Sequence, residues 1–205
     1  MTAQYLRFWH DRALYAEPFA APHHRLDGPT VFGDDRPIWL DVGCSAGEFL
    51  LSQAAAQPAL GFIGIDISPK PLYYAVNEAA RLGLKNVLFV RANVRLVYPL
   101  LVDGSLSAVT VLFPPPFSKP QYYHHRLVNA EFAAAMARAM KPGSPLTLMT
   151  DDAGYFDQMK AVFAQDSRFE LVREEVGMME PVLTRYQAAK QALGLVSRGV
   201  WLVRR

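Results

Sequence analysis

Along most of the chain, the spacing of apolar residues switches between a pattern typical of strands and one typical of helices. Short runs of apolar and β-branched residues, typical of buried strands, are followed by longer segments whose apolar residues recur at helical spacing. The pattern predicts strands over residues 38–42, 61–67, 86–91, 107–113, 145–150, 169–176 and 196–203. It predicts helices over residues 46–57, 69–82, 127–140, 153–164 and 185–193, with Ser68 as the N-cap of the second. Strands and helices therefore alternate from residue 38 to the end of the chain.

This alternation predicts the fold class and the domain organisation. Buried strands that alternate with helices indicate an α/β protein with a doubly wound, mainly parallel, seven-stranded sheet covered on both faces. The last two strands lack a helix of full crossover length between them, so we expect an antiparallel edge. Residues 1–36 are polar and contain several Pro and Gly residues. They predict an N-terminal arm that precedes a single domain over residues 37–205.

The composition is that of an ordinary globular domain. The chain has 205 residues, of which 51% are hydrophobic and 20% charged, enough to form one full core. The single Cys44 excludes an internal disulfide framework and fits a reducing compartment. Charged residues such as Arg7 and Asp11 interrupt the N-terminal segment, and no apolar run is long enough to span a membrane. We therefore expect a cytoplasmic protein without a membrane partner.

Charge is concentrated near the end of the chain. The net charge of +2 is too small to indicate a nucleic-acid partner by itself. Residues 181–205 nevertheless contain five Arg or Lys residues and no acid. This segment is either a solvated basic helix and tail or a rim that faces a polyanion.

The turn after the first strand, in the stretch DVGCSAGEFL, carries the first candidate site. Gly43 and Gly47 allow the backbone to turn tightly and to approach a ligand, and the following helix offers free N–H groups. Asp66 ends the second strand about 20 residues later, where an acid typically binds a ribose diol. A glycine turn alone is weak evidence. The turn and the acid in this order favour a nucleoside cofactor.

The same turn also matches the G-x-S-x-G nucleophile elbow, which would make Ser45 a nucleophile. A hydrolase of that class needs an acid and then a catalytic His after the nucleophile. The only His residues after Ser45 are His124 and His125, and the turn follows the first core strand, too early for that fold. We therefore reject a serine hydrolase.

The cofactor is expected to carry no phosphates, because the turn lacks both the Lys of a P-loop and the third glycine of a dinucleotide site. S-adenosylmethionine fits, with its amino acid end over the glycine turn, Asp41 near its ammonium and Asp66 on its ribose. Asn93, after the third strand, either binds the adenine edge or satisfies local backbone groups. The residues assigned to this site are Asp41, Gly43, Ser45, Gly47, Asp66, Ile67, Asn93 and Phe113.

From about Leu40 onward the chain resembles the bacterial tRNA (guanine-N7)-methyltransferases. The stretches that carry the resemblance are DVGCSAGEFL, FIGIDIS, LGLKNVLFVRANV, FPPPFSK, HRLVNAEF, KPGSPLTLMTDDAGYFDQM and PVLTRYQAAKQALG. The resemblance implies the class I, Rossmann-like S-adenosylmethionine-dependent methyltransferase fold. It also implies RNA, namely tRNA, as the partner and a guanine as the methyl acceptor.

The sequence departs from this family mainly in the segment after the fourth strand. The family motif F-P-D-P-W-P-K becomes FPPPFSK, so Pro115 replaces the Asp and Phe117 the Trp. The basic run that follows in the family is replaced by PQYYHH, residues 120–125. Further departures are Ser45, Asn93 and Gln187.

The chemistry of the implied acceptor limits what the site must supply. Guanine N7 carries a lone pair and no proton, so its methylation needs orientation rather than a general base. The resemblance places Asp151 and Lys119 in the catalytic group, with the prolines after the fourth strand as a rigid wall. It places Thr184, Arg185 and Gln187, together with Asp151, in the substrate site.

Two alternatives to this function remain at the level of the sequence. The lost basic run favours a methyltransferase with another acceptor, and Pro115 favours a non-catalytic cofactor- or RNA-binding relative. A metal enzyme is not expected, because the His23-His24 and His124-His125 pairs are adjacent residues that extended backbone directs to opposite faces. The oligomeric state has no signal in the sequence.

Overall fold

A computed structural model describes residues 25–178 and 184–205 of the chain. It contains one seven-stranded sheet with the order β3-β2-β1-β4-β5-β7-β6. The strands are β1 (Ile38–Val42), β2 (Gly61–Asp66), β3 (Val87–Arg91), β4 (Leu106–Leu112), β5 (Pro145–Thr150), β6 (Phe169–Gly177) and β7 (Ser197–Arg204). The predicted mainly parallel α/β sheet is confirmed, as is the antiparallel edge.

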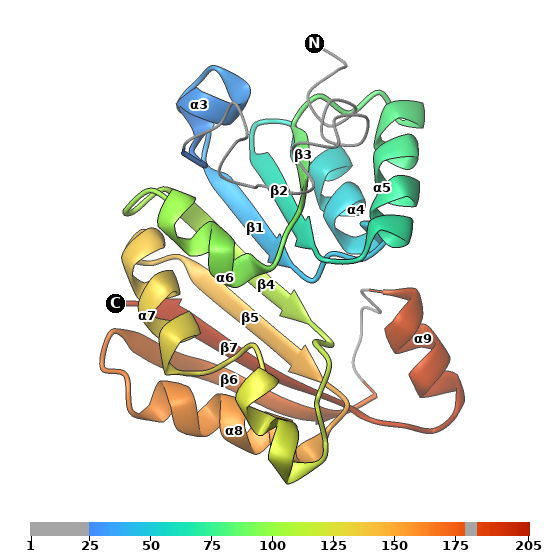
Figure 1. Ribbon diagram of the computed structural model, residues 1–205, viewed down its shortest axis with the longest axis vertical. Helices are drawn as coiled ribbons and strands as arrows, with labels where there is room; N and C mark the ends of the chain where they lie inside the picture. Colours follow the sequence, from blue (N-terminus) through green and yellow to red (C-terminus); the bar gives the residue numbers. More distant parts are fainter. Residues whose placement is uncertain (1–24, 179–183) are drawn as a thin grey trace.

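The direction of the strands sets the position of the site. Strands β3, β2, β1, β4 and β5 pair in parallel, and β7 is inserted antiparallel between β5 and β6. The chain winds outward from β1 through β2 to β3 and then crosses to β4 on the other side of β1. The strand order therefore switches between β1 and β4, and ligands of such sheets bind at the carboxyl ends of the strands there. Figure 1 shows the arrowheads of β4 and β5 directed toward the edge beside α9.

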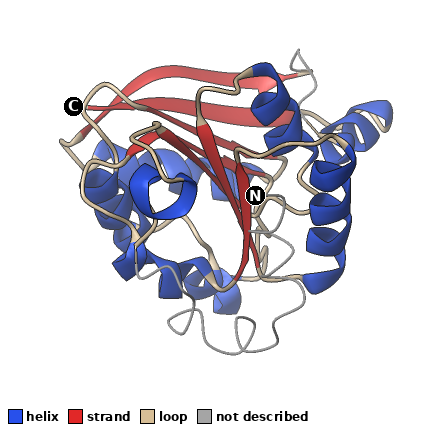
Figure 2. Cartoon of the chain, turned by 90° about the horizontal axis from the view of Figure 1, so that it is seen from above, coloured by secondary structure: helices blue, strands red, loops and turns tan. Residues whose placement is uncertain are grey.

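Helices cover both faces of the sheet (Figure 2). Helices α4 (Glu48–Ala56) and α5 (Pro69–Arg81) cover one face, and α7 (Ala130–Ala139) and α8 (Ala153–Ala164) cover the other. The remaining helical segments are α3 (Gly28–Phe32), α6 (Val94–Val97), η1 (Tyr98–Leu100), η2 (Pro120–His125) and α9 (Arg185–Ala192). The sequence pattern did not predict α3, α6, η1 or η2, which are all too short for a helical period to stand out.

Local chemistry moves two helix starts from their predicted positions. Helix α4 begins at Glu48 rather than at residue 46, because Gly47 has a left-handed backbone with φ 73°. Helix α7 begins at Ala130, because the Asn129 side chain caps it by accepting from the Phe132 N–H at 3.0 Å. Ser68 does hold the N-cap position of α5, but its side chain makes no capping hydrogen bond.

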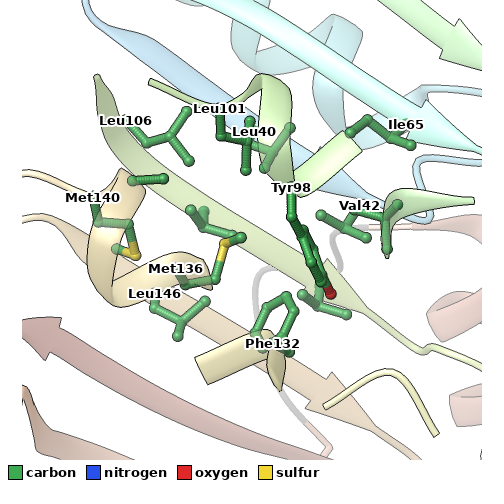
Figure 3. Close-up of a cluster of buried hydrophobic side chains, with 14 of the residues drawn as sticks. Leu40, Val42, Ile65, Tyr98, Leu101, Leu106, Phe132, Met136, Met140 and Leu146 are labelled. Atoms are coloured by element: carbon green, nitrogen blue, oxygen red, sulfur yellow. The ribbon is translucent and has the colours of Figure 1, made fainter. Parts of the chain in front are cut away.

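The larger core lies between the sheet and the layer of α7 and α8. Leu40, Leu106 and Leu146 of the strands pack with Phe132 and Met136 of α7 in one fully buried cluster (Figure 3). A run of apolar residues in β2 is buried on both faces, as the two helical layers require. This core holds β1, β4 and β5 rigidly, so that the loops at their carboxyl ends have a fixed base.

The segment just before β1 packs against the sheet domain. The Leu26 N–H donates to the Leu100 carbonyl at 2.8 Å, and Val31 of α3 is fully buried. Residues 1–24 of the predicted N-terminal arm, with His23 and His24, lie outside the described residues. In the described ranges no helix combines the length and the hydropathy that a membrane crossing requires.

Candidate functional site

The turn between β1 and α4 is shaped by three residues with positive φ. Gly43, Ser45 and Gly47 have φ values of 80°, 50° and 73°. The N–H groups of Gly43 and Cys44 both donate to the Ile65 carbonyl of β2, at 2.7 and 3.1 Å. Ser45 is uncommon in this conformation, because a side chain there typically costs about 1–2 kcal/mol. The turn is thus tied to β2 and retains strain at a predicted site residue.

The carboxylate of Asp66 connects this turn to the loop after β2. Its Oδ2 accepts from the Ser45 N–H at 2.9 Å, and its Oδ1 accepts from the Ser68 N–H at 2.7 Å. A carboxylate offers about four acceptor positions, so two remain for a ligand. The two backbone contacts fix the orientation of the group that the sequence assigns to a ribose diol.

Asp66 lines a cavity of about 500 Å³, which we call the Asp66 cavity. The predicted residues Gly43, Ser45, Ile67, Asn93 and Phe113 line it as well. Its opposite wall comes from the loop after β4, with Pro114, Pro115, Phe117 and His125. The structure thus brings together six of the eight residues assigned to the cofactor.

Asn93 performs one of its two predicted roles in the structure. Its Oδ1 accepts from the Arg95 N–H at 3.1 Å and caps α6. Contact of its amide group with an adenine edge stays a prediction. Gly47, also assigned to the cofactor, is not among the residues that line the cavity. Its positive φ instead permits the turn into α4.

A second cavity of about 320 Å³, the Asp41 cavity, lies on the other side of the turn. Asp41 is 3% exposed, and its Oδ1 accepts from the Thr110 hydroxyl at 2.6 Å. Burial raises the pKa of Asp41 to about 7, repulsion from Asp66 adds to this, and the Thr110 hydrogen bond opposes it. Among the described residues, no Lys or Arg forms an ion pair with Asp41.

Asp151, which the sequence assigns to the acceptor side, directly follows β5. Its Oδ2 accepts from the Tyr186 hydroxyl at 2.9 Å and pairs with Lys190 Nζ at 3.0 Å. Burial pushes the pKa of Asp151 up, but the hydrogen bonds from Lys190 and Tyr186 outweigh it and hold the pKa below its usual value. Asp151 is therefore ionised at neutral pH. Tyr186 and Lys190, which hold it, were not assigned to the site from the sequence.

Helix α9 carries the other predicted substrate residues. Thr184 caps it by accepting from the Gln187 N–H at 3.1 Å. Arg185 is tied to α4, because its backbone N–H donates to Glu48 Oε2 at 2.9 Å and its Nε lies 2.8 Å from Glu48 Oε1. Thr184 and Arg185 line the Asp41 cavity together with Tyr186, through which Asp151 is connected to it. Gln187, by contrast, is fully buried.

Lys119 lies apart from these groups. It is exposed at the N-cap of η2 and is not among the residues that line either cavity. Asp152 is the N-cap of α8, since its Oδ1 accepts from the Tyr155 N–H at 2.7 Å. The sequence favours this capping role for Asp152 and assigns only Asp151 to the site, and the structure confirms the cap.

The buried Arg126 fixes the loop after β4. It is 2% exposed, donates from Nε to the Pro116 carbonyl at 2.7 Å, and donates from Nη1 to Gln158 Oε1 of α8 at 2.8 Å. The loop itself has positive φ at Phe113 and Phe117, 54° and 42°. No local pattern marks Arg126, because its partners are distant in sequence. Among the residues described, no cluster of His, Cys, Asp or Glu could hold a metal ion.

The chain matches known methyltransferases in sequence. A family model described as "Putative methyltransferase" covers residues 35–197. A tRNA (guanine-N(7)-)-methyltransferase of Rubrobacter xylanophilus is 40% identical over 190 residues, which are 91% of this chain and 84% of that protein. The protein of the same name from Chloroherpeton thalassium is 32% identical over 177 residues, 86% of this chain and 77% of that protein.

Solved structures share the fold at lower identity. TrmN from Thermus thermophilus matches with a TM-score of 0.62 at 19% identity, over 83% of this chain and 45% of that one. An antibiotic-related methyltransferase matches with a TM-score of 0.61 at 19% identity, over 82% and 87% of the two chains. These likenesses show the class I methyltransferase fold.

The residues at the strand switch fit S-adenosylmethionine. The buried Asp41 carboxylate suits an ammonium group, and Asp66 retains acceptor positions for hydroxyls beside a cavity of about 500 Å³. The chain is an S-adenosylmethionine-dependent methyltransferase that belongs to the tRNA (guanine-N7)-methyltransferase family.

Proposed function

We propose that this enzyme methylates N7 of a guanine in tRNA. The observation that carries the proposal is the 40% identity, over 91% of the chain, to a tRNA (guanine-N(7)-)-methyltransferase. The absence of a carboxylate from the loop after β4 does not oppose the proposal, because the N7 acceptor has no proton to remove and needs no general base.

The cofactor would be held on both sides of the glycine turn. Asp66 would accept from the ribose hydroxyls with the acceptor positions that Ser45 and Ser68 leave open, and Asn93 would contact the adenine. Asp41 would pair with the ammonium of the amino acid end, which returns its pKa toward the usual value. When bound, S-adenosylmethionine supplies an electrophilic methyl group on a sulfonium.

The protein's own contribution to the transfer is orientation and exclusion of water. Pro114 and Pro115 line the Asp66 cavity on a loop that Arg126 fixes, so this wall yields little when a base enters. Asp151, ionised at neutral pH, would accept from guanine N–H groups and offset the positive charge that develops on the purine. Arg185 would contact a phosphate or a base edge.

One oxygen of the Asp151 carboxylate would perform this role. Its Oδ2 is occupied by Tyr186 and Lys190, which leaves Oδ1 as the acceptor for a base. Guanine would be received by Oδ1, with Lys190 keeping the carboxylate ionised. Lys119 would then act outside the cavities, on RNA phosphates.

Transfer to another RNA position is the second candidate. It is favoured by Pro115, which lines the Asp66 cavity where the family motif has an Asp.

For guanine-N7 transfer, loss of such an electrostatic partner typically costs about 2–4 kcal/mol of transition-state stabilisation. A slow guanine-N7 methyltransferase is therefore expected rather than an inactive one.

The test is methylation of unmodified tRNA transcripts by the full-length chain with methyl-labelled S-adenosylmethionine, followed by nucleoside analysis. We expect label in 7-methylguanosine, and none with Asp66→Ala. Label in a different nucleoside would support the second candidate. Normal cofactor binding without any labelled nucleoside, on tRNA or bulk RNA, would refute both.

A further inference from the structure

A group of exposed aromatic side chains lies at the mouth of the Asp66 cavity. Phe117, Tyr122 and Tyr123 are 37%, 44% and 40% exposed. Together with His125 they form what we call the aromatic platform. Phe117 and His125 line the cavity, whereas Tyr122 and Tyr123 extend the platform beyond it. In Figure 1 this segment is the yellow-green coil that follows β4 and lies beside α8.

The rings contact one another as a set. The centroids of Phe117 and His125 are 5.5 Å apart, and those of Tyr122 and His125 are 6.1 Å apart with an interplanar angle of 28°. The Arg126 guanidinium lies 3.8 Å from the centre of the Tyr123 ring and covers one of its faces. Tyr123 is therefore an anchor, and Tyr122 and Phe117 are the rings best placed to receive a partner.

Two arginines hold the platform in place. The buried Arg126 binds the Pro116 carbonyl on its inner side. Arg95 of α6 donates from Nη2 to the carbonyls of His124 and Arg126, at 3.4 and 3.3 Å. A surface that exposes aromatic rings on a fixed backbone loses little conformational entropy when it binds a flat partner.

Charge around the platform is sparse. The segment 113–125 contains one Lys, Lys119, and no Arg, Asp or Glu. The segment itself therefore offers phosphates a single cationic side chain. Stacking on bases is possible for every nucleotide, because each base has a π-face, and unpaired bases of RNA loops are commonly bound in this way.

We propose that the aromatic platform stacks on an unpaired base of the RNA substrate next to the methylated guanine. The identity of the partner as RNA rests on the proposed function. The position of the platform is independent of it, because Phe117 and His125 line the Asp66 cavity whatever molecule enters it. Stacking on this surface would provide RNA affinity in place of the phosphate contacts that a basic segment would make.

The direct test is RNA binding by Tyr122→Leu, which keeps an apolar side chain but removes the ring. The probes are a labelled RNA hairpin with a guanine-containing loop and a blunt duplex of the same stem. We expect wild type to prefer the hairpin, and Tyr122→Leu to lose on the order of tenfold in hairpin affinity. Tyr122→Phe, which keeps the ring, should bind like wild type. Tyr74→Leu on α5, where the tyrosine is 56% exposed, is the matched control and should also bind like wild type.

Salt dependence separates stacking from phosphate contacts. Between about 50 and 200 mM salt, Tyr122→Leu should show the same salt slope as wild type, because no ion is released by stacking. Lys119→Gln, which removes a charge, should reduce the slope by about one if Lys119 contacts a phosphate. A reduced slope in Tyr122→Leu would contradict the proposal.

The outcomes distinguish the platform from the proposed function. Wild-type affinity of Tyr122→Leu for the hairpin, no preference for the hairpin over the duplex, or no RNA binding at all would each overturn the platform. Selective hairpin binding that depends on Tyr122, but with no 7-methylguanosine formed, would refute the proposed acceptor and leave the platform standing. Affinity for S-adenosylhomocysteine should be unchanged in Tyr122→Leu, which excludes a folding defect.

Discussion

Asp41 gives predictions at the scale of the residue, because its buried carboxylate is the group assigned to the ammonium of the cofactor. Its carboxylate is buried, and its pKa is raised from 3.8 to about 7. An acid with a raised pKa binds its proton more tightly in the folded state, so its ionisation costs folding stability as the pH rises from about 4 to 7. Pairing with an ammonium group recovers this cost. The ionised carboxylate therefore lowers the stability of the fold unless a cation pairs with it.

Asp41→Asn should therefore raise stability and weaken cofactor binding. Asn can still accept from the Thr110 hydroxyl, but it has no charge to bury. Thermal unfolding should show similar midpoints for the two proteins at pH 4 and a higher midpoint for the variant at pH 8.

Calorimetry should show that wild-type affinity for S-adenosylmethionine rises on the order of fivefold to tenfold between pH 6 and pH 7.5. The variant should bind weakly at both values of pH. Equal affinity of the two proteins at pH 7.5 would exclude Asp41 from the ammonium site.

A second prediction at the residue scale is that Pro115→Asp restores a carboxylate that assists methyl transfer. Pro115 is exposed and lines the Asp66 cavity, so the new side chain would face the acceptor. The rate of guanine-N7 methylation should rise by no more than the equivalent of about 2–4 kcal/mol. The gain could be smaller, because loss of a proline loosens the loop. Cofactor affinity should stay constant, and an unchanged rate would show that a carboxylate at this position does not assist transfer.

At the scale of elements, the sequence predicted the strands and helices whose apolar residues recur at a regular spacing. All seven strands and the five longer helices were correct, because buried strands and amphipathic helices repeat within a short window. The turn residues Gly43 and Asp66 were predictable for the same reason, as each follows directly from a strand end. Arg126, Tyr186 and Lys190 were not, because their contacts with Gln158 and Asp151 join segments about 30 or more positions apart, which only the fold brings together.

Arg126 gives an element-scale prediction, because it joins the loop after β4 to α8. Arg126→Leu would leave the Pro116 carbonyl and the Gln158 amide oxygen without their donor. We expect the free energy of unfolding to fall on the order of 3 kcal/mol. Arg81→Gln is the control, since the Arg81–Glu78 pair is largely exposed and such pairs contribute less than about 1 kcal/mol.

Urea unfolding of the two variants measures this difference. A loss in Arg126→Leu no greater than that in Arg81→Gln would show that the loop is held by other contacts. RNA affinity of Arg126→Leu, measured well below its unfolding transition, should also fall, because the aromatic platform loses its support.

At the scale of the whole molecule, the two halves of the sheet meet at the cofactor site. Asp41, Gly43 and Asp66 come from β1 and β2, whereas Phe113 and Pro115 come from β4 and the loop after it. A ligand that contacts both halves binds only when the sheet is assembled. Its binding free energy therefore adds to the stability of the entire domain.

S-adenosylhomocysteine, which lacks the reactive methyl, measures this linkage without turnover. At a concentration of about 100 times Kd it should stabilise the fold by about 2.7 kcal/mol. For a chain of this size that corresponds to a rise of about 5–11 °C in the unfolding midpoint. Asp66→Ala should rise much less at the same concentration, because the ribose hydroxyls lose their acceptor while the rest of the site remains. NAD, whose phosphates have no Lys or third glycine to bind them in this turn, should give no shift. An equal shift with NAD, or none with S-adenosylhomocysteine, would contradict the assignment of this sheet edge to the cofactor.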